Sequence, residues 1–176
     1  MSSILEPKAQ DKIVLPRGDR LDWDHYFMSL AILASLRSPD PSTCVGAILI
    51  SKDNRVLGMG YNSAPKGVSV GLFNWARDNE DMLKNKYPYI LHAEISCIAH
   101  ASGDLTNSIL YVTLHPCNQC AQLIIQKGIK KVFYLKNPYK DTWQVQAAIN
   151  LFDWAGVEIK QFNPLIKEIK IDINTD

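Results

Sequence analysis

Residues 92–135, HAEISCIAHASGDLTNSILYVTLHPCNQCAQLIIQKGIKKVFYL, carry the clearest pattern in the chain. Helix-like and strand-like segments alternate there, with a helix expected at 92–101, a strand at 109–113, a helix at 117–127 and a strand at 131–135. Alternation of this kind is typical of βαβ units, in which helices cover a sheet. The stretch therefore predicts a layered α/β fold.

Five more elements are expected on either side of this stretch. A helix begins after an N-cap at Asp22 and is stopped by the prolines of 38–41, and a hairpin of strands follows at 44–50 and 55–59. A helix at 142–154 and a strand at 157–162 complete the pattern. Because a hairpin joins antiparallel strands, the sheet is expected to be mixed. Residues 73–89, after a glycine-rich loop, have a mixed pattern with some helical character.

Length and composition indicate a single globular domain. The chain has 176 residues, of which 47% are hydrophobic and 21% are charged. This is enough apolar material for a core, and it excludes a mostly disordered chain. A loosely ordered arm is expected at 1–21, the domain at 22–165 and a tail at 166–176.

Charge and hydropathy argue against two classes of partner. Nineteen Lys and Arg residues against eighteen Asp and Glu give a net charge of +1, so nucleic-acid binding is not expected. No apolar run approaches the roughly 18–20 residues of a membrane span, and the polar N-terminus lacks the apolar segment of a secretory signal. The expected location is therefore the cytoplasm, where thiols stay reduced.

The four cysteines are expected to be thiols or metal ligands. Cys44 and Cys97 have no cysteine close by in sequence and are interpreted as small hydrophobic residues. Cys117 and Cys120 lie three residues apart at the expected start of a helix, so both sulfurs can reach one ion, and the helix N-terminus favours the thiolate. Alone, this pair fits a redox dithiol, part of a zinc site or chance.

His92 and Glu94 give the cysteine pair a more specific interpretation. Catalytic zinc usually has three protein ligands and a water, and His92 with the two cysteines would supply three. Glu94 could move protons at the attacking water without binding the metal. The pattern H-x-E followed by P-C-x-x-C, which is complete in this chain, is the signature of zinc nucleobase deaminases.

The chain from about Trp23 to Phe162 resembles the deoxycytidylate (dCMP) deaminase family of the cytidine deaminase superfamily. The resemblance rests on WDHYFM (23–28), RSPDP (37–41), VGA (45–47), GMGYN (58–62), KYPY (86–89), HAE (92–94), YVT (111–113), PCNQC (116–120) and LIIQKGIK (123–130). It implies a three-layer α/β/α fold around a five-stranded mixed sheet. It also implies zinc-dependent hydrolytic deamination of dCMP to dUMP and ammonia, a homo-oligomer (in many members a hexamer) and regulation by dCTP and dTTP.

The resemblance further implies roles for single residues. Glu94 passes protons between the attacking water, ring atom N3 and the leaving ammonia, the Ala93 N–H faces the pyrimidine carbonyl and Asn62 hydrogen-bonds the sugar. The remaining implied sites are the zinc ligands His92, Cys117 and Cys120; the phosphate candidates Tyr139, Lys140, Arg37, Arg77 and Lys66; and an effector loop with Tyr61, Asn62, Ser63 and Lys66.

Three positions depart from the family pattern near the expected substrate and effector sites. Ser96 stands where the family has Asn, His115 where it has Phe and Ser63 where it has Gly. Ser96 has a shorter reach than Asn, His115 is titratable, and Ser63 lacks the backbone freedom of glycine. Ser96 and His115 are counted among the substrate-binding candidates, and the three changes bear on substrate preference and regulation.

The sequence leaves other functions open. Another deaminase of the superfamily could act on dCTP, cytidine or a 5-substituted dCMP. A zinc-stabilised regulatory module without turnover would fit better if Glu94 were absent. A redox protein that uses Cys117 and Cys120 would leave the His92-Ala93-Glu94 stretch unexplained.

Overall fold

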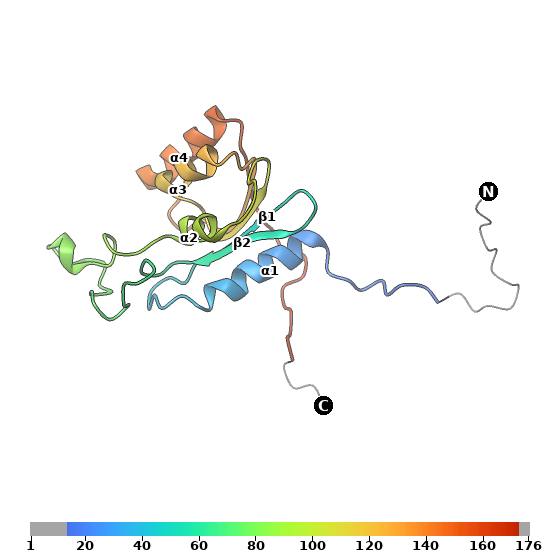
Figure 1. Ribbon diagram of the computed structural model, residues 1–176, viewed down its shortest axis with the longest axis horizontal. Helices are drawn as coiled ribbons and strands as arrows, with labels where there is room; N and C mark the ends of the chain where they lie inside the picture. Colours follow the sequence, from blue (N-terminus) through green and yellow to red (C-terminus); the bar gives the residue numbers. More distant parts are fainter. Residues whose placement is uncertain (1–13, 173–176) are drawn as a thin grey trace, which may run out of the picture.

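The computed structural model describes residues 14–172 as a five-stranded mixed sheet between two layers of helices (Figure 1). The elements in chain order are α1 (Trp23–Ser35), β1 (Gly46–Ile50), β2 (Val56–Tyr61), a short 3₁₀ turn (Met82–Lys84), α2 (Ala93–His100), β3 (Ile109–Leu114), α3 (Asn118–Gln126), β4 (Lys131–Lys136), α4 (Trp143–Trp154) and β5 (Glu158–Gln161). The predicted α/β fold class and the mixed sheet are confirmed.

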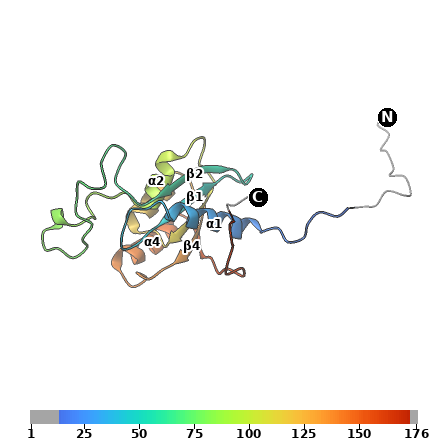
Figure 2. The same ribbon diagram turned by 90° about the horizontal axis from the view of Figure 1, so that it is seen from below.

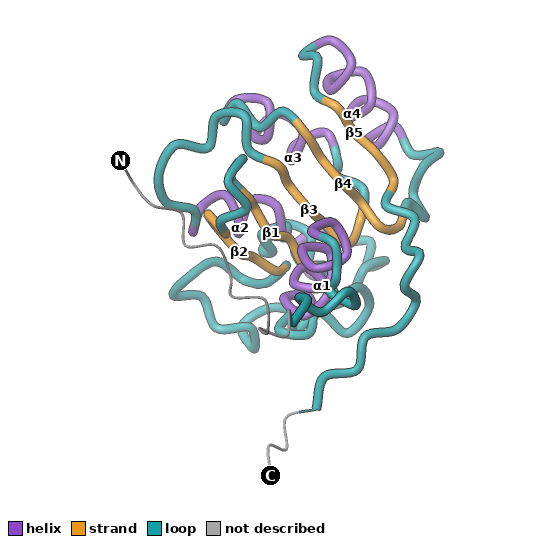
Figure 3. The backbone as a smooth tube through the Cα atoms, turned by 90° about the vertical axis from the view of Figure 1, so that its right-hand side faces the viewer, coloured by secondary structure: helices purple, strands orange, loops and turns teal. Residues whose placement is uncertain are grey.

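The strand order in the sheet is β2-β1-β3-β4-β5 (Figure 3). β1 pairs antiparallel with both β2 and β3, whereas β3, β4 and β5 run parallel. The helices α3 and α4 provide the crossovers between the parallel strands, as parallel pairing requires. α1 covers one face of the sheet, and α2, α3 and α4 cover the other (Figures 1 and 2).

Alternate residues of the central strand β1 serve the two layers of the core. Ile48 and Ile50 pack in the cluster under α1, together with Phe27, Tyr111 and Phe133. Their neighbours Ala47 and Leu49 point to the opposite face, into the cluster under α2, α3 and α4. All five residues of β1 are buried, because helices cover both faces of this strand.

Two glycines of β2 let α2 lie directly on the strand. A Cβ at Gly60 would lie 2.2 Å from the backbone nitrogen of Cys97, and one at Gly58 would lie 2.6 Å from the Cys97 carbonyl oxygen. No side chain fits in that space, since backbone cannot move as a flexible side chain can. The close approach fixes the position of α2, which carries Glu94 in its first turn.

Some predicted boundaries shift for physical reasons. The strand expected at 44–50 begins at Gly46, because the backbone of Val45 bonds to Asn62 instead of joining the β1–β2 ladder. The strand expected at 55–59 continues to Tyr61, since Gly60 and Tyr61 pair with Ala47 and Gly46.

Residues 64–90 form a long loop that projects from one end of the sheet (Figure 2). The helical character expected at 73–89 is limited to the 3₁₀ turn Met82–Lys84. The two ends of the loop lie side by side, because Ser63 and Leu91 form an antiparallel bridge with N···O distances of 3.2 and 2.8 Å.

The predicted arm at 1–21 and tail at 166–176 extend beyond the described residues, and these limits stay predictions. Residues 14–22 lack regular structure and are exposed. After β5 the chain returns to the start of α1, where the backbone N–H groups of Leu165 and Ile166 donate to Nε2 of the buried His25. Within 14–172, no helix combines the length and apolar character needed to cross a membrane.

Candidate active site

The starts of two helices bring the three predicted zinc ligands together. His92 is the N-cap of α2, Cys117 is the N-cap of α3, and Cys120 lies in the first turn of α3. Nδ1 of His92 lies 3.4 Å from Sγ of each cysteine. Because the three ligand atoms all lie within 4.8 Å of one another, a single ion can contact all of them.

The distances and the donor set fit tetrahedral zinc. Zn–N bonds of roughly 2.0–2.1 Å and Zn–S bonds of about 2.3 Å separate nitrogen from sulfur by about 3.5 Å in a tetrahedron. The observed separation of 3.4 Å agrees with this geometry. Three protein ligands also leave a fourth position for water, which is the arrangement of catalytic zinc.

Without a bound metal, two of the three ligands hold protons that zinc would replace. The pKa of Cys117 is lowered to about 4, first by its hydrogen bond with the Cys120 thiol and then by the His92 ring. The same hydrogen bond and burial raise the pKa of Cys120, so Cys120 keeps the proton that the two sulfurs share. The hydrogen bond with Cys117 raises the pKa of His92 to about 9. Zinc binding would displace these protons, since it takes thiolate and neutral imidazole.

Glu94 lies next to these ligands without belonging to them. It lies in the first turn of α2, only 4% of its surface is exposed, and it lines the cavity described below. Burial raises the pKa of its carboxyl group. A carboxyl with a raised pKa can accept a proton and give it up again near neutral pH, which a general acid–base must do.

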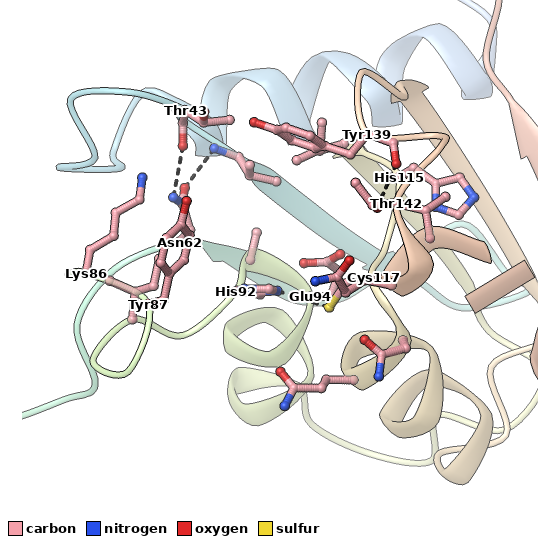
Figure 4. Close-up of a pocket in the computed structure, with 18 of the residues that line it drawn as sticks. Thr43, Asn62, Lys86, Tyr87, His92, Glu94, His115, Cys117, Tyr139 and Thr142 are labelled. Atoms are coloured by element: carbon pink, nitrogen blue, oxygen red, sulfur yellow. Dashed lines mark hydrogen bonds between the residues drawn. The ribbon is translucent and has the colours of Figure 1, made fainter. Parts of the chain in front are cut away.

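His92, Cys117 and Glu94 line a cavity of about 590 Å³ (Figure 4). Besides Ala93, Leu114, His115, Asn118 and Gln119, which are close to the zinc ligands in sequence, three groups of residues contribute to its wall. They are the segment before β1 and the end of β2 (Asp40, Thr43, Val45 and Asn62), the long loop (Arg77, Met82, Lys86, Tyr87 and Ile90), and the segment from the end of β4 into α4 (Tyr139, Thr142, Trp143, Gln144 and Val145). A cavity of this size can hold a small organic ligand.

The structure gathers some of the predicted substrate and effector residues and leaves others apart. Asn62, Ala93, His115 and Tyr139 line the cavity, and so does the phosphate candidate Arg77. The residues that do not line it are Ser96, Lys140, Arg37, Tyr61, Ser63 and Lys66. Ser63 instead takes part in the bridge with Leu91 at the base of the long loop.

The side-chain amide of Asn62 makes three hydrogen bonds within the protein, which the sequence does not indicate. Its Nδ2 donates to Oδ2 of Asp40 at 3.1 Å and to the carbonyl oxygen of Thr43 at 3.0 Å, and its Oδ1 accepts from the Val45 N–H at 2.7 Å (Figure 4). Both amide protons are therefore used within the protein. Contact with a sugar would rely on the second lone pair of Oδ1.

His115 has a lowered pKa because it is buried. Nδ1 of its neutral ring donates to the Pro116 carbonyl oxygen at 2.9 Å, and the ring packs edge-on against Tyr134. At this position the histidine therefore acts as an aromatic wall residue in its neutral form.

Sequence reasoning did not assign roles to Asp40, Lys86 and Tyr87, which also line the cavity. These residues stood within the stretches RSPDP and KYPY that carried the family resemblance. The available signals were Asp40, which stands between two prolines, and Lys86, which precedes the aromatic stretch Tyr87–Tyr89. Neither stretch shows in sequence that its charge is buried.

Comparison with known proteins agrees with this site. Residues 21–136 match the family model described as "Cytidine and deoxycytidylate deaminase zinc-binding region", which covers more than half of the chain. This chain belongs to the cytidine and deoxycytidylate deaminase family. The matched region includes the ligands His92, Cys117 and Cys120, so the family assignment and the geometry of the cluster both support bound zinc.

Individual members of the family are similar over most of their length. The chain is 44% identical to the deoxycytidylate deaminase of Mus musculus and 42% identical to that of Homo sapiens, over 160 residues and 90% of each chain. Among solved structures, the dCMP deaminase of cyanophage S-TIM5 in complex with dCMP and dUMP is similar with a TM-score of 0.64 and 28% identity. That likeness covers 79% of this chain and 96% of the cyanophage protein.

Proposed function

We propose that this deaminase hydrolyses dCMP to dUMP and ammonia. The observation that carries the proposal is the placement of Glu94 beside the His92, Cys117 and Cys120 cluster at the wall of a nucleotide-sized cavity. The mouse and human relatives named above are deoxycytidylate deaminases, and their similarity extends over nine-tenths of the chain.

The chemistry divides between the metal and the protein. When bound, zinc supplies a Lewis acid that activates water for attack at neutral pH. Glu94 removes a proton from that water, delivers one to N3 of the cytosine and then assists the departure of ammonia from C4. The N–H of Ala93, at the first position of α2, is free of helical hydrogen bonding and can donate to the pyrimidine carbonyl.

Arg77 and two tyrosines supply an anion site away from the zinc ligands. Nε of Arg77 donates to the Tyr87 hydroxyl at 3.1 Å, and Nη2 donates to the Tyr139 hydroxyl at 3.3 Å. These bonds raise the pKa of Arg77 above its ordinary value, so it keeps its charge. Among residues 14–172 it forms no ion pair.

The hydrogen-bonding capacity of this group fits a phosphate. Each tyrosine oxygen accepts from Arg77, so each hydroxyl proton remains to be donated, and Arg77 keeps three further N–H donors. A site made of donors alone suits a ligand made of acceptors, and an arginine fork is matched to phosphate oxygens. This favours a nucleoside monophosphate over free cytidine as the substrate.

Replacement of Arg77 by Met should therefore lower kcat/KM for dCMP by roughly 10- to 100-fold, because a charged hydrogen bond to the phosphate is lost. The kcat/KM for deoxycytidine, which has no phosphate, should change less than about 2-fold. Loss of cytosine absorbance measures both rates. Arg55→Met, at an exposed arginine of the β1–β2 turn, is the matched control. Equal losses for the two substrates would contradict a phosphate role.

A substrate panel tests the function itself. The zinc-loaded protein is offered dCMP, dCTP, cytidine and 5-methyl-dCMP, and the products are separated chromatographically. Conversion of dCMP with the highest kcat/KM is the expected result. A higher value for another substrate would reassign the enzyme within the family, and no turnover of any of them would support a regulatory zinc module.

We also infer that the chain forms a homo-oligomer. Large apolar side chains are exposed along one face of α1, at Trp23, Tyr26 and Leu33, and at its C-cap residue Leu36. A second copy is the occupant that the family resemblance suggests. Light scattering should give a multiple of 19.8 kDa for the wild type and a smaller mass for Leu33→Asp. A monomeric wild type would contradict the inference.

The cytoplasm is the proposed location, since the zinc ligands include two thiols that must stay reduced. Regulation by dCTP and dTTP through the segment with Tyr61, Asn62, Ser63 and Lys66 stays a prediction.

A further inference from the structure

The long loop has almost no core of its own. Of residues 64–90, only Asn85 and Lys86 are buried, and both are polar. The loop contains a small aromatic cluster of Phe73, Trp75 and Tyr89. Apolar burial therefore contributes little to holding this loop against the body of the protein.

A buried ion pair between Lys86 and Asp40 attaches the loop to the body of the protein. Nζ of Lys86 lies 2.5 Å from Oδ2 of Asp40, and the two side chains are 5% and 1% exposed. Asp40 also accepts hydrogen bonds from the backbone N–H groups of Ser42 and Thr43 and from Nδ2 of Asn62. Burial alone would raise the pKa of the Asp40 carboxyl, but the hydrogen bond with Lys86 and then those from the Ser42 and Thr43 N–H groups lower it below its ordinary value, so the carboxylate is charged.

The ion pair attaches the part of the loop that carries the anion site. The backbone N–H of Lys86 donates to the carbonyl oxygen of Ala76, the residue before Arg77. The next residue along the chain, Tyr87, accepts the hydrogen bond from Nε of Arg77. Next to it, Oδ1 of Asn85 accepts from the backbone N–H of Asn79, and Nδ2 of Asn85 donates to the Asn79 carbonyl oxygen. Lys86 therefore lies in the middle of a set of hydrogen bonds between residues 85–87 and 76–79, and these bonds hold the segment that carries Arg77.

We propose that the Asp40–Lys86 ion pair positions the Arg77 and Tyr87 side chains at the wall of the cavity, where they bind the phosphate of the substrate. This inference rests on the proposed function, because it takes the phosphate of dCMP as the ligand of Arg77. Lys86 and Asp40 act through Arg77. Neither belongs to the group of zinc ligands or to the acid–base chemistry of Glu94.

The test compares ligands with and without a phosphate. In Lys86→Met, the KM for dCMP and the inhibition constant of dUMP should rise at least about 10-fold, whereas the inhibition constant of deoxyuridine should change less than about 2-fold. The kcat should change only a few-fold. Lys84→Met removes an exposed lysine of the same loop, whose partner Asp81 lies 3.7 Å away, and should leave all four values unchanged.

A double-mutant cycle tests whether Lys86 acts through Arg77. If it does, Lys86→Met should weaken dUMP binding less than about 2-fold when Arg77 is already Met, because coupled residues are not additive. Multiplicative losses in Arg77→Met/Lys86→Met would overturn the proposal. Equal weakening of dUMP and deoxyuridine, or no weakening of either, would overturn it as well.

A second variant guards against misfolding. Removal of Lys86 alone leaves a buried carboxylate without its cation, which is strongly destabilising. Asp40→Asn/Lys86→Met removes both charges and should keep bound zinc and a near-wild-type Tm while it loses the preference for dUMP over deoxyuridine. Retention of that preference would overturn the proposal. A wild type that does not deaminate dCMP would refute the proposed function instead.

Discussion

Glu94→Gln is expected to reduce kcat for dCMP by roughly 10²- to 10⁴-fold, the usual contribution of a positioned acid–base group. Gln has nearly the same shape as Glu but cannot accept the proton from water or deliver it to N3. Because Glu94 is not among the zinc ligands, the zinc content should be unchanged. Loss of cytosine absorbance gives the rate, and metal analysis of the same sample gives the zinc content.

The matched control for this substitution is Glu80→Gln, at an exposed glutamate of the long loop, which should keep full activity. A Glu94→Gln variant with more than about a tenth of the wild-type kcat would contradict the assigned role. Loss of zinc from that variant would show instead that the carboxylate supports the metal site.

Cys120→Ser should abolish both zinc binding and turnover. The wild type is expected to bind about one zinc ion per chain, and a serine hydroxyl is a much poorer ligand than a thiolate. Cys120 is fully buried among residues of α2 and α3, so loss of the ion that joins these helices should also lower the Tm. Metal analysis and thermal unfolding with and without a chelator measure the two effects.

Two other cysteines separate the metal effect from the packing effect. Cys97 is buried as completely as Cys120, and burial raises its pKa to about 12, so it stays a thiol. Cys97→Ala should lower the Tm and keep the zinc, and the exposed Cys44→Ser should keep both. If Cys120→Ser retained one zinc per chain, the proposed ligand set would be wrong.

The zinc ligands and Glu94 could be proposed from sequence because their geometry is mostly local. Cys117 and Cys120 are three residues apart at one helix start, so their spacing alone places both sulfurs on one side of the helix. His92 and Glu94 both lie at the start of another helix, so sequence neighbourhood alone keeps the carboxyl close to the ligand. The strands and helices around them follow from periodicity, since a half-buried strand and an amphipathic helix have different periods. The long-range pairing of these elements was implied only by the family resemblance.

The wall of the cavity was harder to predict because its contacts join distant parts of the chain. Asp40 and Lys86 are 46 residues apart, and Arg77 reaches Tyr139 across 62 residues. Nothing in the local pattern at Lys86 distinguishes a buried lysine from an exposed one, and charged residues are rarely buried unless paired. The hydrogen bonds of the Asn62 amide within the protein were not predicted for the same reason, since its partners Asp40 and Thr43 lie about 20 residues earlier.

The bridge between Ser63 and Leu91 has a consequence for how this family can diversify. Since the two ends of the 64–90 segment meet at neighbouring backbone positions, its length and composition can change without displacing β2 or α2. Insertions and substitutions in its exposed parts, away from the buried Asp40–Lys86 ion pair, would be tolerated as they are in other surface loops. Selection for a new substrate can therefore act on an exchangeable segment, while the hydrolytic residues at the starts of α2 and α3 are inherited unchanged.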